Sequence, residues 1–233
     1  MQKIYLGKLS TILLLTVAGV WADQEPRKLE FTVYGQYPVR NVEYMPISES
    51  ALQKGEKAPA PIRIQTHSLA RMGPHFFKGG DRINFYDTRT KDLVGRVIIP
   101  DLSNEWLLIF VRNPRYKDNP DSQLRYLIYP FNDSLKHLPN NSLVFLNISG
   151  KKLEGLLEDK RVSLSMGESE AYQIQESLPV NLWASDFEGK ELLPALIKTY
   201  RFAPNHRYLM IFFAPVLTGS VDLDVRFLAE SVE

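Results

Sequence analysis

One short motif carries the residues of a serine nucleophile. Residues 167–171 read GESEA, the loose Gly-x-Ser-x-Ala form of a nucleophile elbow, and Ser169, Asp186 and His206 follow the chain order of α/β-hydrolases. An elbow needs a helix directly after the serine, whereas the following residues alternate like a strand up to the next proline. The 17 residues from Ser169 to Asp186 are also too few for the crossovers of a parallel sheet. We therefore expect a turn between two strands here.

Other ionisable side chains are spread along the chain. Carboxylates could still converge in the cleft of a hydrolase, and the candidates are Asp81, Asp87, Asp101 and Asp186. The four histidines are His67, His75, His137 and His206, and no two have a spacing that suits a metal site. The chain has no GxGxxG, GxxxxGK[ST] or HExxH motif. We expect no metal and no cofactor.

Two polar or aromatic stretches could bind a ligand. Residues 117–123, KDNPDSQ, offer oxygen ligands of the kind that calcium prefers, but the spacing is not that of an EF-hand, and a polar turn is the alternative. Tyr34, Tyr37 and Tyr44 could form a sugar-stacking or protein-docking surface, because tyrosine combines a flat apolar ring with a polar group. The same tyrosines could instead pack along an edge strand.

Composition excludes several classes of protein. The sequence has 233 residues and no cysteine, so thiol catalysis, iron–sulfur clusters, thiolate zinc sites and disulfide scaffolds are excluded. The 28 basic and 27 acidic residues nearly balance, and no long basic run is present. This balance argues against a nucleic-acid partner.

The first residues resemble a secretory leader. Lys3 and Lys8 precede a mostly apolar segment, 9–20, and Val20-Trp21-Ala22 suits a signal-peptidase site. The apolar segment is shorter than the roughly 20 residues of a membrane span. We expect a signal peptide over 1–22 and a secreted or periplasmic mature protein. Three Asn-x-Ser triplets, at Asn132, Asn140 and Asn147, would carry sugar only in a source with an ER.

Short segments with period-two alternation predict strands along most of the chain. Residues 220–228, SVDLDVRFL, show the pattern clearly, because Val221, Leu223, Val225 and Phe227 share one face. Glycine, asparagine and proline separate the segments. The best helical candidate, residues 189–202, contains Pro194, which costs a helix interior about 3 kcal/mol. We expect it to be mainly extended.

Two apolar runs that resemble one another suggest an internal repeat. WLLIFV (106–111) aligns with YLMIFF (208–213) at an offset of 102, and both are apolar on both faces, as buried central strands are. LRYL (124–127) aligns with VRFL (225–228) at an offset of 101. Upstream, INFYD (83–87) corresponds to VNLWASD (180–186). A four-strand unit therefore recurs in the same order.

We accordingly predict an all-β chain with two related β-sandwich, Ig-like lobes, or one extended antiparallel β-sandwich with an internal pseudo-repeat. The expected division is a signal peptide over 1–22, an N-terminal lobe over 23–150 and a C-terminal lobe over 151–233. Residues 46–61 and 112–123 are expected to be exposed loops.

Two functional hypotheses remain open. The first is an exported, non-catalytic module that binds or scaffolds a protein, a glycan or a cell-wall polymer of the envelope. The second is an exported hydrolase with a carboxylate-lined cleft. Convergent ionisable groups in a concave site would favour the hydrolase.

Overall fold

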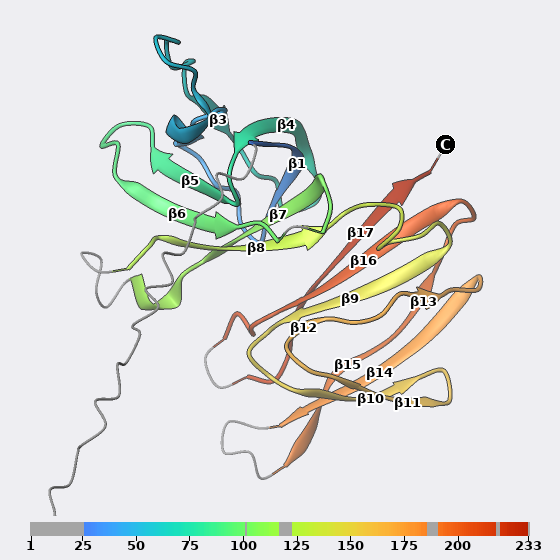
Figure 1. Ribbon diagram of the computed structural model, residues 1–233. Helices are drawn as coiled ribbons and strands as arrows, with labels where there is room; N and C mark the ends of the chain where they lie inside the picture. The colour runs from blue at the N-terminus through green and yellow to red at the C-terminus, as the bar shows by residue number, and fades with distance from the viewer. Residues whose placement is uncertain (1–25, 101, 117–122, 186–190, 218–219, 233) are drawn as a thin grey trace, which may run out of the picture.

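The computed structural model shows an all-β protein with four sheets, so the predicted class is confirmed (Figure 1). It describes residues 26–100, 102–116, 123–185, 191–217 and 220–232. Within these ranges the helical elements are two single 3-10 turns, η1 (Glu49–Ala51) and η2 (Pro114–Tyr116). No helix long and apolar enough to cross a membrane occurs in the described ranges. The expected leader lies outside them.

The N-terminal part of the chain forms two four-stranded sheets. The sheet that we call the N inner sheet has the order β4-β1-β7-β8 and consists of β1 (Arg27–Gly35), β4 (Met72–Gly79), β7 (Glu105–Arg112) and β8 (Tyr126–Asn132). The N outer sheet has the order β3-β2-β5-β6 and consists of β2 (Val42–Tyr44), β3 (Ile62–Ile64), β5 (Arg82–Asp87) and β6 (Leu93–Ile98). One apolar core lies between them. We call this unit the N lobe.

The C-terminal part repeats the arrangement and is called the C lobe. Its inner sheet has the order β12-β9-β16-β17, with β13 also on β9, and consists of β9 (Ser142–Ile148), β12 (Gly167–Glu168), β13 (Tyr172–Gln173), β16 (His206–Phe213) and β17 (Asp224–Ser231). Its outer sheet has the order β11-β10-β14-β15 and consists of β10 (Leu153–Leu157), β11 (Lys160–Leu164), β14 (Ser177–Ser185) and β15 (Leu192–Arg201). Pro194 thus lies in a strand, as expected.

The two lobes share strand order, strand direction and register. In both inner sheets the first strand of the lobe runs parallel to the central apolar strand, whereas the other pairings are antiparallel. Phe31 pairs with Trp106 in the N lobe, and Leu143 pairs with Tyr208 in the C lobe. The four strands expected to recur do so in the same order. The repeated unit is larger than expected, because the four preceding strands also correspond.

The alignment that we predicted for the last strand of each lobe is wrong by four residues. Trp106 pairs with Asn132 and Tyr208 pairs with Ala229, so the offset at this strand is 97 and not 101. A strand alternates with period two, so a shift of four residues leaves its apolar face unchanged. The sequence pattern therefore could not fix this register.

Each central apolar strand lies between two cores, which explains why it is apolar on both faces. Alternate residues of β7 point into the N-lobe core, and those between them point into a middle core that the two inner sheets share. Strand β16 does the same with the C-lobe core and the middle core. The four sheets thus stack in the order N outer, N inner, C inner, C outer. The side chains of β7 and β16 in the middle core are Leu107, Ile109, Leu209, Ile211 and Phe213.

Strand β9 precedes the lobe boundary that we expected at residue 150, yet its pairing partners lie later in the chain. Its residues from Leu143 to Ile148 pair with β16, and β12 and β13 cover its other edge. The linking segment between the lobes is therefore residues 133–141, which follow β8 directly.

We expect Phe110→Ala and Phe212→Ala each to lower the free energy of unfolding by about 3–5 kcal/mol, because a large ring is removed from a packed core. Phe110 is 1% exposed and Phe212 is 0% exposed. Because the middle core joins the lobes, urea should unfold each variant in one transition, measured by fluorescence and circular dichroism. Leu217→Ala, at a side chain 73% exposed, should change stability by less than about 0.5 kcal/mol. Two separate transitions would show that the lobes are independent.

Candidate functional site

Ser169, the candidate nucleophile, is part of the pairing along the edge of β9. Its backbone N–H donates to the carbonyl of Phe145 at 2.9 Å, and its Oγ accepts the backbone N–H of Phe145 at 3.0 Å. The same Oγ donates to the carbonyl of Glu170 at 2.8 Å. His206 Nδ1 lies 2.8 Å from the carbonyl oxygen of Pro204. Asp186 lies outside the described residues, and the strand–turn–strand context is that of a structural serine.

The aspartates considered for a hydrolase cleft differ in their surroundings. Asp81 is exposed next to β5. Asp87 is buried, and its carboxylate accepts the backbone N–H groups of Arg89 at 2.9 Å and Thr90 at 3.3 Å and the side chain of Arg125 at 2.9 Å. These donors, the Arg89 N–H first, hold the pKa of Asp87 below its ordinary value. Asp101 and Asp186 lie outside the described residues.

The described histidines have structural neighbours. His75 stacks on the ring of Phe31 with centroids 5.4 Å apart, and burial lowers its pKa. His137 Nε2 lies 2.6 Å from Glu168 Oε2. His67 Nδ1 accepts the backbone N–H of Leu69. Within the described ranges no three side chains of His, Asp or Glu group as metal ligands would. Residues 117–122 of the loop considered for calcium lie outside these ranges.

The three tyrosines predicted as a binding surface lie in separate surroundings. Tyr34 is fully buried in the middle core, and its hydroxyl donates to the carbonyl of Ser68 at 2.9 Å. Tyr44 is fully buried in the N-lobe core. Burial raises the pKa of each to about 12. Tyr37 is half-buried under the guanidinium of Arg112, which lies 5.0 Å from the ring centroid. Only Tyr37 therefore presents part of its ring to solvent.

The Asn-x-Ser triplets at Asn132 and Asn147 form turns that end strands. Asn147 is 1% exposed, and its amide donates to the carbonyls of Lys151 and Leu164 at 2.8 and 3.0 Å. Its oxygen accepts both the N–H and the hydroxyl of Ser149. Asn132 receives the same two bonds from Ser134. A turn-forming role thus explains both triplets.

An apolar groove lies on the N lobe beside β4, and we call it the Phe76 groove. Its volume is about 560 Å³. Phe76 is 59% exposed and Ile62 is 38% exposed, although both are large apolar side chains. Charged residues of both signs also line the groove: Lys28, Lys78, Glu30 and Glu105. The apolar centre with charged neighbours is typical of a docking site.

Most backbone N–H and carbonyl groups beside the Phe76 groove already have hydrogen-bond partners, although β4 is an edge strand. Lys78 donates its N–H to the carbonyl of Pro46 at 2.8 Å and accepts the N–H of Ser48 at 2.9 Å. The carbonyl of Phe76 accepts the hydroxyl of Tyr44 at 3.0 Å. Pro74 has no N–H to offer. A partner strand could pair with little of this edge, so binding here depends on side chains.

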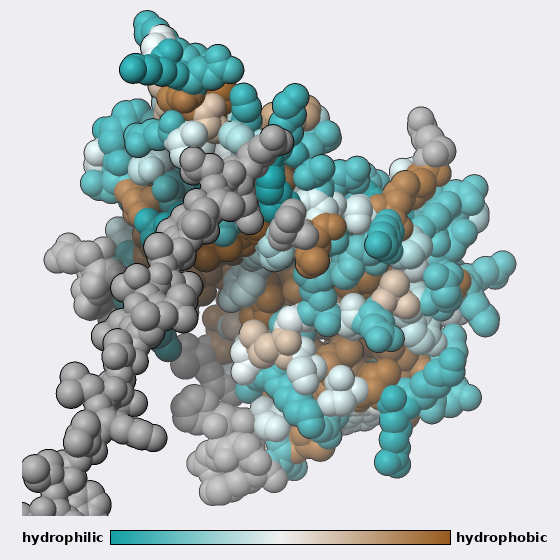
Figure 2. Space-filling model, in the orientation of Figure 1, coloured by the Kyte–Doolittle hydropathy of each residue, from teal (hydrophilic) through white to brown (hydrophobic). Residues whose placement is uncertain are grey.

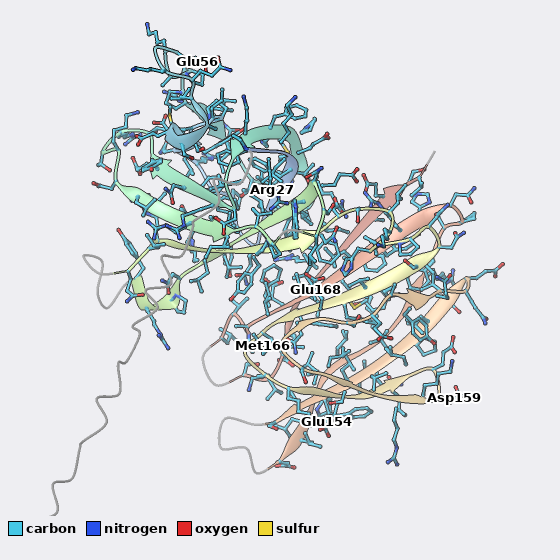
Figure 3. The ribbon with its side chains drawn as sticks, viewed as in Figure 1. Arg27, Glu56, Glu154, Asp159, Met166 and Glu168 are labelled. Carbon is cyan, nitrogen blue, oxygen red and sulfur yellow. The ribbon has the colours of Figure 1, made fainter. Side chains whose placement is uncertain are left out.

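The segment between β2 and β3 projects from the N lobe next to this groove. Glu56 lies near its tip in Figure 3, and Figure 2 shows the projection as a hydrophilic arm with hydrophobic atoms at its base. Residues 52–61, the outer part of the loop predicted at 46–61, are mostly exposed. The base of the arm, around Ile47, borders the Phe76 groove.

A cluster of charged side chains fixes the lobes to one another. Arg71 of the N lobe pairs with Asp133 of the linking segment and, at 3.0 Å, with Glu230 of β17. Arg207 of β16 donates through Nε to Glu230 at 2.7 Å and through Nη1 to the carbonyl of Asp133. Burial raises the pKa of Asp133, although Arg71 and Arg207 oppose the shift. The cluster is formally neutral and joins both lobes and their linker.

The sequence matches no protein-family model and no curated protein.

We expect Asp87→Asn to lower the free energy of unfolding at pH 7 by about 1–2 kcal/mol, because the bonds to a charged acceptor are weakened. The folded-state pKa of Asp87 is lowered, so its stabilising effect is present above its ordinary value of 3.8 and is lost as the pH falls through the folded value. Denaturation curves from pH 7 to pH 2 should show the two proteins converging in acid. Asp81→Asn, at an exposed side chain, is the control. A gap that widens in acid would contradict the assignment.

Arg207→Gln should destabilise the protein by about 3–5 kcal/mol, since it removes one partner from a buried charge cluster. The side chain of Arg207 is 10% exposed. Lys152→Gln breaks a pair whose side chains are 60% and 44% exposed, and it should cost less than about 1 kcal/mol. Thermal and urea denaturation measure both effects. Equal losses in the two variants would refute a structural role for the cluster.

Proposed function

We propose that this protein is an exported, non-catalytic module that binds or scaffolds a component of the cell envelope, in the periplasm or at the cell surface. The proposal includes removal of residues 1–22 as a signal peptide and a mature body of two related, Ig-like β-sandwich lobes. Its basis in the sequence is the basic, apolar and small-residue order of the first 22 residues. Its basis in the fold is the repeated pair of sheets around apolar cores.

The Phe76 groove is the structural feature on which this proposal depends. A 59% exposed phenylalanine in a concave apolar site has an unfavourable contact with water that a partner would remove. Lysines and glutamates surround it, so a protein surface with both charge signs could form pairs at the rim. We infer a protein partner at this site, because aromatic anchors in apolar pockets dominate protein interfaces.

A fixed orientation of the two lobes relative to one another suits a scaffold protein. The middle core and the charge cluster of Arg71, Asp133, Arg207 and Glu230 hold the two lobes in one orientation. A partner bound at the N lobe is therefore held at a fixed position relative to the C lobe. The hydrolase hypothesis gains no support from its two described aspartates, since Asp81 is exposed and Asp87 already accepts three hydrogen bonds.

The test is photo-crosslinking with benzoylphenylalanine at position 76 in cells that naturally make the protein. We expect a covalent adduct with one envelope protein, identified by mass spectrometry, because Phe76 lies in the proposed interface. Position 98 is the matched control, since Ile98 is an apolar strand residue of the same lobe with a similar exposure of 56%. Position 98 should give no such adduct. Equal adducts at both positions, or none at position 76, would count against the proposal.

A further inference from the structure

The outer sheets of the two lobes carry the same cross-strand pair on their outward faces. Glu43 of β2 lies opposite Tyr86 of β5, and Glu154 of β10 lies opposite Trp183 of β14. The pairs are equivalent in the repeat, because a register shift directly precedes each aromatic residue, after Phe85 in β5 and after Leu182 in β14, and both of these preceding residues lie in the core of their own lobe. An acid beside an aromatic ring is therefore a common feature of both outer faces, which form the two ends of the four-sheet stack.

The pair is covered in the N lobe. The side chain of Glu43 is 8% exposed and is bound by Lys91 at 2.6 Å. Residues of the arm, including Ile47 and Leu52, line the groove in front of Tyr86. The chain itself thus occupies part of this face.

The equivalent face of the C lobe is open. Only a tight turn joins β10 to β11, so no arm is present there. The side chain of Glu154 is 44% exposed, and it is bound by Lys152 at 2.6 Å. Figure 3 places Glu154 on the side of the C lobe away from the N lobe. A groove of about 580 Å³, which we call the Trp183 groove, lies on this face.

The Trp183 groove combines an aromatic ring with polar groups of both kinds. Trp183 has Glu154 opposite it on one neighbouring strand and Pro194 on the other. Leu156 and Leu192 add apolar surface, and Arg161 and Ser163 add polar groups on β11. In the described part of the chain, the indole N–H of Trp183 has no hydrogen-bond partner. A flat ring beside donors and acceptors suits a sugar, whose C–H face packs on the ring while its hydroxyls bond at the edge.

The charges of the groove favour an acidic sugar. Two cations, Lys152 and Arg161, and one carboxylate, Glu154, line it. Lys152 is paired with Glu154, whereas Arg161 has no ion-pair partner among the described residues. A guanidinium without a partner suits the carboxylate of a uronic acid, which it can bind through two parallel bonds.

We propose that the Trp183 groove binds an acidic polysaccharide, with Trp183 as the stacking platform, Arg161 bound to a sugar carboxylate and Glu154 and Lys152 bound to hydroxyls. An extended peptide fits less well. Strands β10 and β14 each have paired neighbours on both sides, so a peptide could add no strand over them, and a peptide paired with the edge strand β11 would lie three strand positions from β14 and its Trp183. The site lies on a different lobe from the Phe76 groove, and either site can be present without the other.

Affinity electrophoresis and calorimetry with polygalacturonate test the proposal, and its methyl ester is the uncharged probe. The wild-type protein should bind polygalacturonate, with an affinity that falls as salt rises, and bind the ester at least about tenfold more weakly. Trp183→Ala and Arg161→Glu should each weaken binding at least about tenfold. Trp183→Tyr should retain binding within about threefold, because it keeps an aromatic platform.

Matched controls separate the groove from general charge effects. Arg201→Glu reverses another exposed arginine on the same outer sheet, and Tyr86→Ala removes the equivalent ring of the N lobe; both should bind like the wild type. If Trp183→Ala fails to fold, Arg161→Glu alone decides, since it changes only an exposed side chain. Equal binding of the acid and its ester, no binding of either, or no effect of Arg161→Glu would overturn the proposal. Displacement of polygalacturonate by a peptide of residues 48–61 would assign the groove to peptides instead.

Discussion

Burial of both faces of the two central strands is the constraint on which the structure depends. Leu107 and Ile109 of β7, and Leu209 and Ile211 of β16, point away from the cores of their own lobes and into the middle core. If the lobes separated, these side chains would face water over much of two inner sheets, an exposed apolar area that soluble proteins avoid. Each lobe therefore needs the other, although each has a complete core of its own.

The same constraint explains how the repeat could diverge. Leu107 and Leu209 occupy equivalent positions on opposite sides of the middle core, so the interface uses the same surface of both units, as a twofold dimer does. The inner sheets must keep apolar side chains toward the middle core, so their sequences can diverge little. The outer faces have no such requirement, and they differ: the N lobe carries the arm between β2 and β3, whereas the C lobe has a short turn at the equivalent place.

Period-two alternation and the two apolar runs were enough to predict the all-β class and the order of the later strands in each lobe. They could not give the register of β8 and β17, because a four-residue shift preserves alternation. Nor could they place Tyr34 and Tyr44, since tyrosine packs as well in a core as on a surface. The outward-facing aromatic residue of each proposed groove did leave a signal in the sequence. In VNLWA, Trp183 shares a face with Asn181, and adjacent Phe76 and Phe77 cannot both point inward.

The fixed orientation of the two lobes also fixes the two grooves relative to one another. The Phe76 groove belongs to the N lobe and the Trp183 groove to the far outer sheet of the C lobe. Between them lie the middle core and the cluster around Asp133, neither of which can rearrange without exposing apolar side chains or leaving a buried charge unpaired. Ligands at the two grooves would thus be held at a fixed separation and angle. If both proposed ligands bind, a duplicated lobe whose inner face is used for self-association, and whose outer faces are free to differ, gives a direct route from one binding unit to an adaptor between two unlike ligands.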